Sequence, residues 1–349
     1  MAKVGIIGTG WGARVQVPTF REAGVEVVAI AGHNRDRTRR IAGELGVEVV
    51  NDWRDVLATD ADLISIVTPP SRHLEMATAA LAAGKHVLSE KPTAVDSAEA
   101  EQLVAAANAR PQQLALIDHE LRFLPAYRAA RERVAELGVV RYIDARYASP
   151  GRGDRTRAWD WWSDAGQGGG VWGAVGSHFV DTIRYIGCEI EAARGFFETI
   201  VAERPHDGGM KRVTSDDFAS VQLRLRGSGL ATINLSVVAT GADETSTLTI
   251  HCEHGALRLI GEELLFATRG EPAFRRIAGD DFAQRPGNTA GGAFGSGTLL
   301  LAHALRAAID DGDRAALAPA ATFVDGLAQQ RVLDAARRSA NNQGRWETV

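Results

Sequence analysis

The first residues of the chain constrain its fold more than any other segment. An apolar run, 4–7, leads directly into Gly8-Thr9-Gly10-Trp11-Gly12-Ala13, and the residues that follow can continue as a helix. A strand, a glycine turn and a helix start in this order predict a dinucleotide site. Gly8 permits the tight turn, Gly10 leaves room for a pyrophosphate, and the small Ala13 lets the helix pack on the strand. Glycines in such a turn can also be purely geometric, so the motif alone does not decide the function.

Composition narrows the class of protein. The chain has 349 residues, enough for two domains that each bury a core. Its net charge is −5 and it has no long basic block, which argues against nucleic acid or a membrane as a partner. No apolar run has transmembrane length, and the first predicted strand lies too close to Met1 for a signal peptide. The cysteines are Cys188 and Cys252 alone, which favours a cytoplasmic protein over a disulfide framework.

The first third of the chain alternates between strand-like and helical segments. Pro69-Pro70 ends one predicted strand, and Gly84 is a suitable cap for one predicted helix. This alternation predicts a doubly wound parallel sheet in a Rossmann domain of residues 1–118. The predicted strands are 4–7, 25–31, 47–50, 63–68, 86–88 and 114–117, and the predicted helices are 36–45, 73–83 and 96–107.

The remaining residues, 119–349, have a different pattern. Longer runs of alternating polarity predict a large, open, mostly antiparallel sheet with one face covered. We expect an α/β domain with C-terminal helices that pack back on the first domain. Residues 278–296 resemble a long loop. The predicted strands are 142–148, 195–201, 218–225, 231–238 and 246–251, and the predicted helices are 125–137, 299–309 and 323–340.

A second marker is Glu90-Lys91-Pro92, which follows a predicted parallel strand. Doubly wound folds bind ligands at the carboxyl ends of their strands. Lys91 can therefore reach a substrate hydroxyl beside a nicotinamide ring, although a lysine in a turn is usually only a surface residue. The tripeptide is uninformative alone and becomes specific when it is combined with the glycine turn.

With these motifs the chain resembles the Gfo/Idh/MocA oxidoreductases, the group of glucose-fructose oxidoreductase and inositol dehydrogenase. The resemblance extends over nearly the whole chain. It implies a Rossmann domain, a C-terminal α/β domain with an open sheet, and oxidation or reduction of a secondary carbinol of a sugar, cyclitol or related polyol with NAD or NADP. The further matching motifs are Thr68-Pro69-Pro70 with His73, Gly84-Lys85-His86-Val87, His119 with Arg122-Phe123 and Pro125, Gly168-Gly169-Gly170, Gly176-Ser177-His178 with Asp181, Asp325-Gly326-Leu327, and Asp334-Ala335.

The resemblance also implies the site residues. Lys91 would stabilise a developing alkoxide, and His178 would transfer the proton, a role that suits histidine side chains in general near neutral pH. Asp181 shares a helix face with His178 and either orients the imidazole or complements the helix dipole. We expect no metal. The expected cofactor-binding residues are Gly8, Gly10, Trp11, Gly12, Ala13, His33, Asn34, Arg35, Thr68, Pro69, His73, Glu90 and Lys91.

The segment before His178 departs from the family pattern. The family commonly has an aspartate four residues before this histidine, and this chain has Ala174 there. One interpretation is that Lys91 and His178 suffice. A second is that Asp160 or Asp164 replaces the missing carboxylate. A third is that the protein binds the cofactor without turnover. We favour the first two together, because the rest of the site pattern is present.

The tip of the second predicted strand bears on the choice of cofactor. NAD-selective sites place an acid there to hold the ribose 2′-hydroxyl. Residues 31–35 contain no acid, and Arg35 and Arg37 are close to the tip. Because arginine accepts a 2′-phosphate that an acid would repel, NADP is favoured and NAD is the alternative. Asp36 belongs to the helix start, where it is a suitable cap. The arginines can also be simple surface residues of a helix.

The remaining expectations concern substrate and partners. Trp159 and Trp161 are either a wall for a sugar ring or core filler. His119 and Arg122 either face the cleft or make structural hydrogen bonds. We expect a small polyhydroxylated substrate and a homo-oligomer, a dimer or tetramer, formed through the open sheet. The alternatives to a dehydrogenase are a sensor or regulatory protein without turnover and redox-assisted elimination at a glycoside.

Overall fold

The computed structural model describes residues 1–50, 52–227, 229–241, 245–271, 273–278 and 292–349. The chain separates into two compact units. The first consists of Met1–Ala94, Ala98–Leu124 and Phe282–Leu327, and the second of Val95–Ser97, Pro125–Asp281 and Ala328–Val349.

Two sequence-based expectations concern these segments. The division at residue 118, with C-terminal helices that pack back on the first domain, stays a prediction; residues 292–327 group with the N-terminal sheet. Of the expected loop 278–296, residues 279–291 lie outside the described residues. Residue 278 ends a strand, and residues 292–296 are the first turn of a helix, so these parts of the expected loop are wrong.

The first unit is built on a seven-stranded sheet in the order β17-β6-β5-β4-β1-β2-β3. The first six strands along the chain pair in parallel, and only β17 is antiparallel to its neighbour. The order reverses at β1, which lies between β4 and β2, and this is where such sheets bind ligands. The strands are β1 (Lys3–Ile7), β2 (Glu26–Ala31), β3 (Glu48–Val49), β4 (Leu63–Ile66), β5 (His86–Ser89), β6 (Ala115–Ile117) and β17 (Ala321–Thr322).

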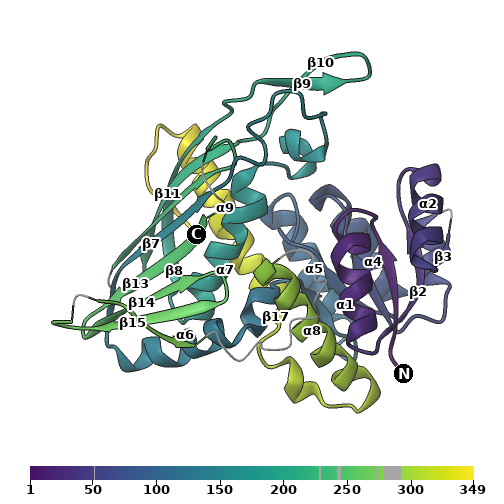
Figure 1. Ribbon diagram of the computed structural model, residues 1–349, viewed down its shortest axis with the longest axis horizontal. Helices are drawn as coiled ribbons and strands as arrows, with labels where there is room; N and C mark the ends of the chain where they lie inside the picture. The colour runs from purple at the N-terminus through teal and green to yellow at the C-terminus, as the bar shows by residue number, and fades with distance from the viewer. Residues whose placement is uncertain (51, 228, 242–244, 272, 279–291) are drawn as a thin grey trace. The chain divides into compact units, whose positions relative to one another are not determined.

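Helices cover both faces of this sheet, so its strands are apolar on both sides. In β4, Leu63 packs in one core with Phe20 and Leu301, while Ile64 packs in the other with Met76. Figure 1 shows α1 and α8 side by side on one of these faces. The helices are α1 (Val17–Glu22), α2 (Arg35–Leu45), α3 (Trp53–Leu57), α4 (His73–Ala82), α5 (Ser97–Asn108) and α8 (Gly292–Asp310).

Each glycine of the turn after β1 has a different structural role. Gly8 has a φ of +135°, and a Cβ there would overlap the carbonyl oxygen of Val67. A Cβ on Gly12 would lie 2.8 Å from Ile6 Cγ2, so Gly12 makes the close helix–strand contact that the sequence analysis assigned to Ala13, itself buried in the core. A Cβ on Gly10 would meet no atom of the described residues within 4 Å. The fold therefore requires Gly8 and Gly12, and the space above Gly10 is open.

The second unit contains a nine-stranded sheet in the order β16-β15-β14-β13-β7-β12-β11-β8-β18. Its strands are antiparallel except for the β12–β7 pair. Burial alternates along β11 and β12, which leaves one face covered and the other more open. The strands are β7 (Val140–Ala148), β8 (Ile190–Glu198), β11 (Phe218–Leu225), β12 (Leu230–Ser236), β13 (Thr245–Cys252), β14 (Gly255–Ile260), β15 (Glu263–Thr268), β16 (Arg275–Ala278) and β18 (Glu347–Thr348), with a separate hairpin of β9 (Glu203–His206) and β10 (Gly209–Arg212).

Three helices pack along the covered face (Figure 1). These are α6 (Pro125–Glu136), α7 (Ser177–Tyr185) and the part of α9 (Phe323–Asn341) that belongs to this unit. The amide of Gly195 in β8 donates to Ser339 Oγ at 3.2 Å, and the indole of Trp172 donates to the carbonyl of Leu333 at 3.2 Å. These bonds join α9 both to the sheet and to the segment that leads into α7.

The predicted fold class is confirmed: a doubly wound parallel sheet and a large, open, mostly antiparallel sheet. β8 begins at Ile190, five residues before the predicted strand. Strands β14 to β16 and the β9–β10 hairpin were not predicted.

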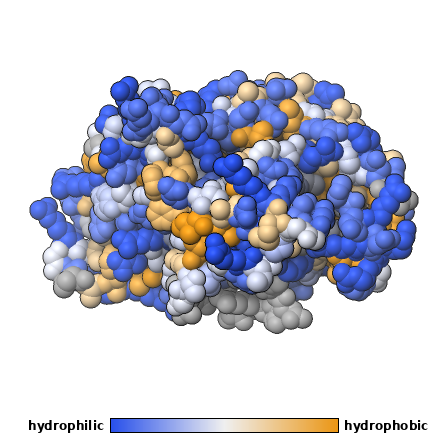
Figure 2. Space-filling model, turned by 90° about the horizontal axis from the view of Figure 1, so that it is seen from above, coloured by the Kyte–Doolittle hydropathy of each residue, from blue (hydrophilic) through white to orange (hydrophobic). Residues whose placement is uncertain are grey.

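The surface is polar over most of the view in Figure 2, with apolar residues gathered in smaller groups. None of the helices in the described part of the chain combines the length and apolarity that crossing a bilayer requires. On the nine-stranded sheet, Tyr142, Phe196 and Leu230 are exposed.

Substitution by alanine should have different effects at Gly8 and at Gly10. We expect Gly8→Ala to lower the free energy of unfolding by about 2 kcal/mol or more, because alanine at positive φ is strained and its Cβ meets Val67. Gly10→Ala is the matched control and should unfold at nearly the wild-type urea concentration. Equal urea midpoints for the two variants would contradict this account of the turn.

Candidate active site

The carboxyl ends of the parallel strands of the first unit carry most of the expected site residues. The backbone hydrogen bonds continue past the strands: Val67 N donates to Ile7 O at 2.7 Å, Glu90 N to Ile66 O at 2.9 Å, and Asp118 N to Ser89 O at 2.8 Å. The residues after β1, β4, β5 and β6 therefore lie along one edge of the sheet. This brings together the glycine turn, Thr68-Pro69, Glu90-Lys91 and the segment at Asp118.

The glycine turn ends in an accessible helix start. The helix begins at Trp11 and passes through one π-helical turn, Gly12–Gln16, before α1. Gly10 is exposed, and the Arg14 guanidinium lies 5.6 Å from the Trp11 ring centroid. Exposed N–H groups at a helix N-terminus attract anions, so this turn suits a pyrophosphate.

The tip of β2 carries no acid. Asn34 is the N-cap of α2 and accepts from Arg37 N at 2.9 Å. Asp36 lies within the first turn and pairs with Arg39 at 3.3 Å, so the expected capping role of Asp36 belongs to Asn34. The side chains of His33 and Arg35 are exposed at the tip.

His73 lies beneath the site rather than on its surface. Its ring is fully buried, with Nε2 2.9 Å from Thr68 O and Nδ1 3.1 Å from Pro92 O. Burial lowers the pKa of His73, which keeps the ring neutral. A neutral ring donates from only one of its nitrogens, so His73 hydrogen-bonds to one of the turns that carry Thr68 and Lys91 and packs against the other.

A group of buried acids surrounds the base of the Lys91 turn. Asp118 is 1% exposed, Glu120 is 3% exposed, and Glu90 is half-buried. The carboxyls of Glu90 and Asp118 lie close enough to influence each other's pKa. Asp118 and Glu120 were not among the site residues predicted from the sequence. The sequence did contain a signal for them, because one acid stands on each side of His119 directly after a predicted strand.

Burial shifts these acids toward their neutral forms. It raises the pKa of Glu90 to about 8, with a further contribution from the nearby charge of Asp118. Burial also raises the pKa of Asp118 to about 6, against the opposing effects of the Gln16 hydrogen bond and the Lys91 charge. The pKa of Glu120 is raised well above its usual value by burial and by the two other carboxyls.

Two expected substrate residues are buried near the same edge. His119 and Arg122 are 2% and 6% exposed. Arg122 pairs with Asp325 at 3.3 Å. Burial acts to raise the pKa of Asp325, but the Arg122 charge and hydrogen bonds from Thr322 lower it overall. This pair favours a structural role for Arg122.

His178 and Asp181 belong to the second unit. Both are buried on α7, which follows a π-helical turn, Trp172–Gly176. Gln329 Nε2 donates to the carbonyl of Ser177 at 2.6 Å, which fixes the start of α7. Ala174 lies on the π-helical turn and is also buried.

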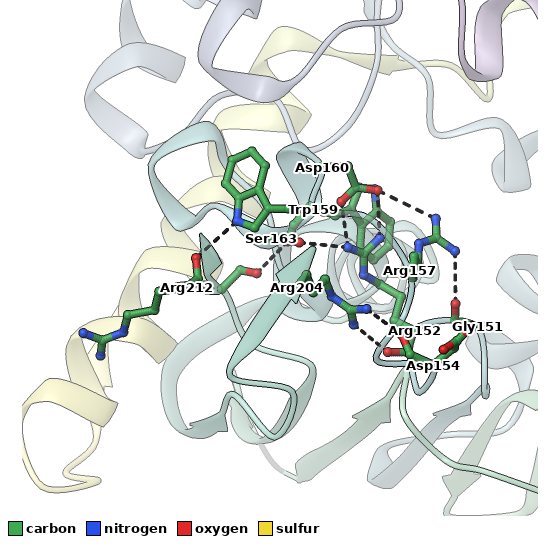
Figure 3. A network of polar contacts seen from close by, with 11 residues as sticks. Gly151, Arg152, Asp154, Arg157, Trp159, Asp160, Ser163, Arg204 and Arg212 are labelled. Atoms are coloured by element: carbon green, nitrogen blue, oxygen red, sulfur yellow. Dashed lines mark hydrogen bonds and ion pairs between the residues drawn. The ribbon is translucent and has the colours of Figure 1, made fainter. Parts of the chain in front are cut away.

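The two candidate replacement carboxylates are both held within their own loop. Asp160 accepts from Arg152 at 2.7 and 3.2 Å and lies 3.7 Å from Arg157. Figure 3 shows these three residues with their contacts drawn. Asp164 accepts from Gly166 N and from Gln167 Nε2, each at 3.0 Å. Such contacts are structural, and they weigh against Asp160 or Asp164 as a substitute for the missing aspartate.

Trp159 and Trp161 are half-buried in the same loop. The Trp159 indole donates to the carbonyl of Arg212 at 3.2 Å, and Lys211 Nζ lies 3.4 Å from its ring centroid (Figure 3 shows the Arg212 bond). The Trp161 ring lies 5.8 Å from that of Trp162. These contacts attach the loop to the β9–β10 hairpin and favour packing over a sugar-binding wall.

Comparison with known proteins identifies the family. The model of an oxidoreductase family with an NAD-binding Rossmann fold matches residues 2–117, and the Gfo/Idh/MocA C-terminal domain model matches residues 127–258. This chain belongs to the Gfo/Idh/MocA family of oxidoreductases. The resemblance inferred from its motifs is confirmed, as is the prediction of an oxidoreductase with a Rossmann domain.

Individual relatives are similar to this chain over its full length. Glucose-fructose oxidoreductase domain-containing protein 2 of Bos taurus is 31% identical over 363 residues, covering 99% of this chain and 93% of the relative. An oxidoreductase domain protein from Kribbella flavida is 30% identical, with 100% of both chains covered and a TM-score of 0.87. Levoglucosan dehydrogenase in complex with NADH and levoglucosan shares the fold at 23% identity, with a TM-score of 0.87 and coverage of 100% of this chain and 99% of that chain.

The raised pKa of Glu90 predicts how stability changes with pH. The folded chain retains the Glu90 proton up to about pH 8, whereas the unfolded chain loses it near the usual value of 4.5. Glu90 therefore stabilises the fold most at low pH, and that contribution is lost as the pH rises to about 8. We expect Glu90→Gln to gain stability relative to the wild type between pH 4 and pH 8.5, measured by urea unfolding.

Asp325→Asn provides the control of opposite sign. Because the pKa of Asp325 is lowered by folding, its contribution is present at higher pH and lost on acidification. This variant should therefore lose stability relative to the wild type as the pH rises through the acid range. A Glu90→Gln difference that is constant with pH would refute the buried, protonated Glu90.

Proposed function

We propose that this chain is an NADP-preferring dehydrogenase or reductase that moves a hydride between nicotinamide and a secondary carbinol of a sugar, cyclitol or related polyol. The observation that carries the proposal is the position of Lys91, at the same sheet edge as the open glycine turn in a chain of an oxidoreductase family. The complex of levoglucosan dehydrogenase with NADH and levoglucosan supports a carbohydrate substrate.

The first unit fits a dinucleotide by its own geometry. The open space above Gly10 and the helix start at Trp11 suit a pyrophosphate. His33, Asn34 and Arg35 would hold the adenosine ribose. When bound, the nicotinamide supplies the hydride chemistry, and the protein must orient the carbinol and handle one proton.

In the proposed reaction Lys91 donates a hydrogen bond to the carbinol oxygen and stabilises the developing alkoxide. His178 takes the hydroxyl proton in oxidation and returns it in reduction, and Asp181 orients the imidazole. Asp160 and Asp164 have no part in this scheme, because their carboxylates are held by the contacts of their own loop.

The NADP preference rests on charge at the tip of β2. His33 and Arg35 are exposed there, and Arg37 follows within the first turn of α2. Guanidinium groups bind a 2′-phosphate by charge-assisted hydrogen bonds. No acidic residue lies between Ala31 and Arg35 to favour the 2′-hydroxyl of NAD.

We also infer the cellular compartment and the oligomerisation of the protein. Both cysteines are free thiols, and burial raises the pKa of Cys188 and of Cys252 to about 11, which suits a reducing cytoplasm. The exposed apolar side chains of Tyr142, Phe196 and Leu230 support association of copies through the nine-stranded sheet.

A cofactor-binding regulatory protein is the second candidate, and Ala174 is the observation that favours it. At the position where the family commonly carries an aspartate, the π-helical turn holds a buried methyl group. A regulator would bind the dinucleotide with no substrate to turn over.

Substitution of the proposed reacting groups tests turnover. Lys91→Ala and His178→Ala should each lower kcat by about 10²-fold or more while cofactor affinity stays near the wild-type value. Assays follow reduced nicotinamide absorbance over a panel of sugars and polyols. Lys85→Ala is the control, since the Lys85 ammonium bonds only to the carbonyls of Thr59 and Ala61 among the contacts described. A wild-type chain that binds NADPH yet oxidises or reduces nothing on the panel would favour the regulatory protein.

Cofactor choice is tested by fluorescence titration with NADPH and NADH. The wild type should bind NADPH more tightly. The double variant Arg35→Ala/Arg37→Ala should weaken NADPH by about tenfold, which corresponds to about 1.4 kcal/mol, and leave NADH nearly unchanged. Arg40→Ala is the matched control, because Arg40 pairs with Glu44 on the exposed face of α2. Tighter binding of NADH by the wild type would reverse the cofactor assignment.

A further inference from the structure

A buried aspartate of the second unit, Asp216, holds the start of the helical segment that carries His178. Asp216 lies two residues before β11. Its backbone carbonyl accepts from Val171 N at 2.9 Å, and its Oδ2 accepts from Trp172 N at 2.7 Å. Amides at the start of a helical segment have no carbonyl of the preceding turn to bond to. Asp216 supplies that acceptor and thereby fixes the residue at which the segment begins.

The other oxygen of Asp216 is held from α9. Arg337 Nη2 donates to Asp216 Oδ1 at 2.6 Å, and the Arg337 guanidinium lies 5.1 Å from the ring centroid of Phe197 in β8. Charge-assisted hydrogen bonds of this kind are among the stronger ones in proteins. Because each oxygen has its own donor, the carboxylate cannot rotate without the loss of a bond. Arg337 therefore orients Asp216 toward Trp172.

Trp172 is held at its side chain as well as at its amide. The side chain is fully buried, and its indole donates to the carbonyl of Leu333 at 3.2 Å. A Cβ on Gly176 would overlap the Trp172 ring, and a Cβ on Gly170 would overlap Asp216 Oδ1. Close packing at both ends leaves the π-helical turn no room to slide past Asp216.

The position of this turn determines where the helix presents His178. The backbone is helical without a break from Val171 to the end of α7. A displacement at Trp172 is therefore transmitted along the helix to the imidazole. Residues 171–177 contain no acid, and Ala174 stands where the family commonly has an aspartate. The carboxylate that anchors this segment thus comes from a different part of the chain.

The next residue, Asp217, has equal burial and a different target. Asp216 and Asp217 are each 5% exposed. The two oxygens of Asp217 accept from Ile200 N and Val201 N, both at 2.8 Å. Among the contacts described, none joins the Asp217 side chain to the turn before His178. Asp217 is therefore a matched control, with the same charge, burial and number of hydrogen bonds.

We propose that Asp216 is a positioning residue for His178: its carboxylate, oriented by Arg337, fixes the start of the helix that carries the imidazole. Asp216 acts through the helix and not on the substrate. The segment before His178 then needs no acid of its own in order to be held in place. Only the link to turnover rests on the proposed function of His178.

The NMR signal of the His178 ring tests this position in the ligand-free chain with isotope-labelled histidine. His178→Gln identifies the signal by its loss. Asp216→Asn places an amide N–H group against one of the two donors, so one bond is lost and the signal should move. Asp217→Asn makes the same chemical change and should leave the signal in place. Arg337→Met removes the guanidinium but keeps a side chain over Phe197, and it should move the signal in the same direction as Asp216→Asn.

The comparison between the variants decides the outcome. An unmoved His178 signal in Asp216→Asn would overturn the proposal, and so would an equal movement in Asp217→Asn. Arg337→Met keeps the test available if Asp216→Asn does not fold, because the altered side chain is partly exposed. An unmoved signal in Arg337→Met would overturn the proposal as well.

Steady-state kinetics on a substrate found with the panel give the second measurement. Asp216→Asn should lower kcat by about tenfold or more, with smaller changes in KM and in NADPH affinity, because a misplaced imidazole affects the chemical step. Asp217→Asn should retain the wild-type kcat. Equal losses of kcat in these two variants would contradict the positioning role. If no substrate is turned over, the proposed function fails, and the NMR signal still decides whether Asp216 positions His178.

Discussion

The parallel register of β1, β4, β5 and β6 is the constraint on which the candidate site depends. The carbonyl of the last residue of a strand accepts a hydrogen bond from the backbone N–H of the residue just after the neighbouring strand. The acceptor and donor residues are Ile7 and Val67, Ile66 and Glu90, and Ser89 and Asp118. Segments far apart in the sequence thereby share one edge. The glycine turn is part of the same arrangement, because the positive φ of Gly8 turns the chain away beside the Val67 carbonyl. A side chain at Gly8 would disturb the register and the turn together.

The cost of this arrangement is concentrated in buried charge. The strand ends that position Lys91 also carry the half-buried Glu90 and the buried Asp118 and Glu120, and folding stability would favour apolar residues at such positions. Retained protons reduce the cost, since neutral acids need only hydrogen bonds. Stabilising contacts surround the group: His73 packs between the two adjoining turns, and Gln16, turned inward at the end of a π-helical turn, donates to Asp118. A local cost in folding free energy that contacts with the surrounding residues offset is typical of functional sites.

Periodicity and turn chemistry were sufficient to predict the fold class and the residues that depend on local sequence. Strand and helix positions followed from apolar spacing, and the glycine turn and Lys91 followed from motifs next to predicted strands. The closeness of Glu90 and Asp118 could not be found in this way, because they are 28 positions apart and come together only through the β5–β6 pairing. Asp160 was a candidate for the same reason: its bond to Arg152, eight residues earlier, depends on how the loop folds.

Ala174 marks the place where the acidic residues of this chain differ from the family pattern. An aspartate is absent four residues before His178, and Asp160 and Asp164 of the preceding loop are held by other groups. The first unit, in contrast, holds three carboxyls around the base of the Lys91 turn. In the proposed reaction, Lys91 of the first unit stabilises the alkoxide. Loss of the aspartate is tolerable for turnover if this stabilisation is the larger part of catalysis.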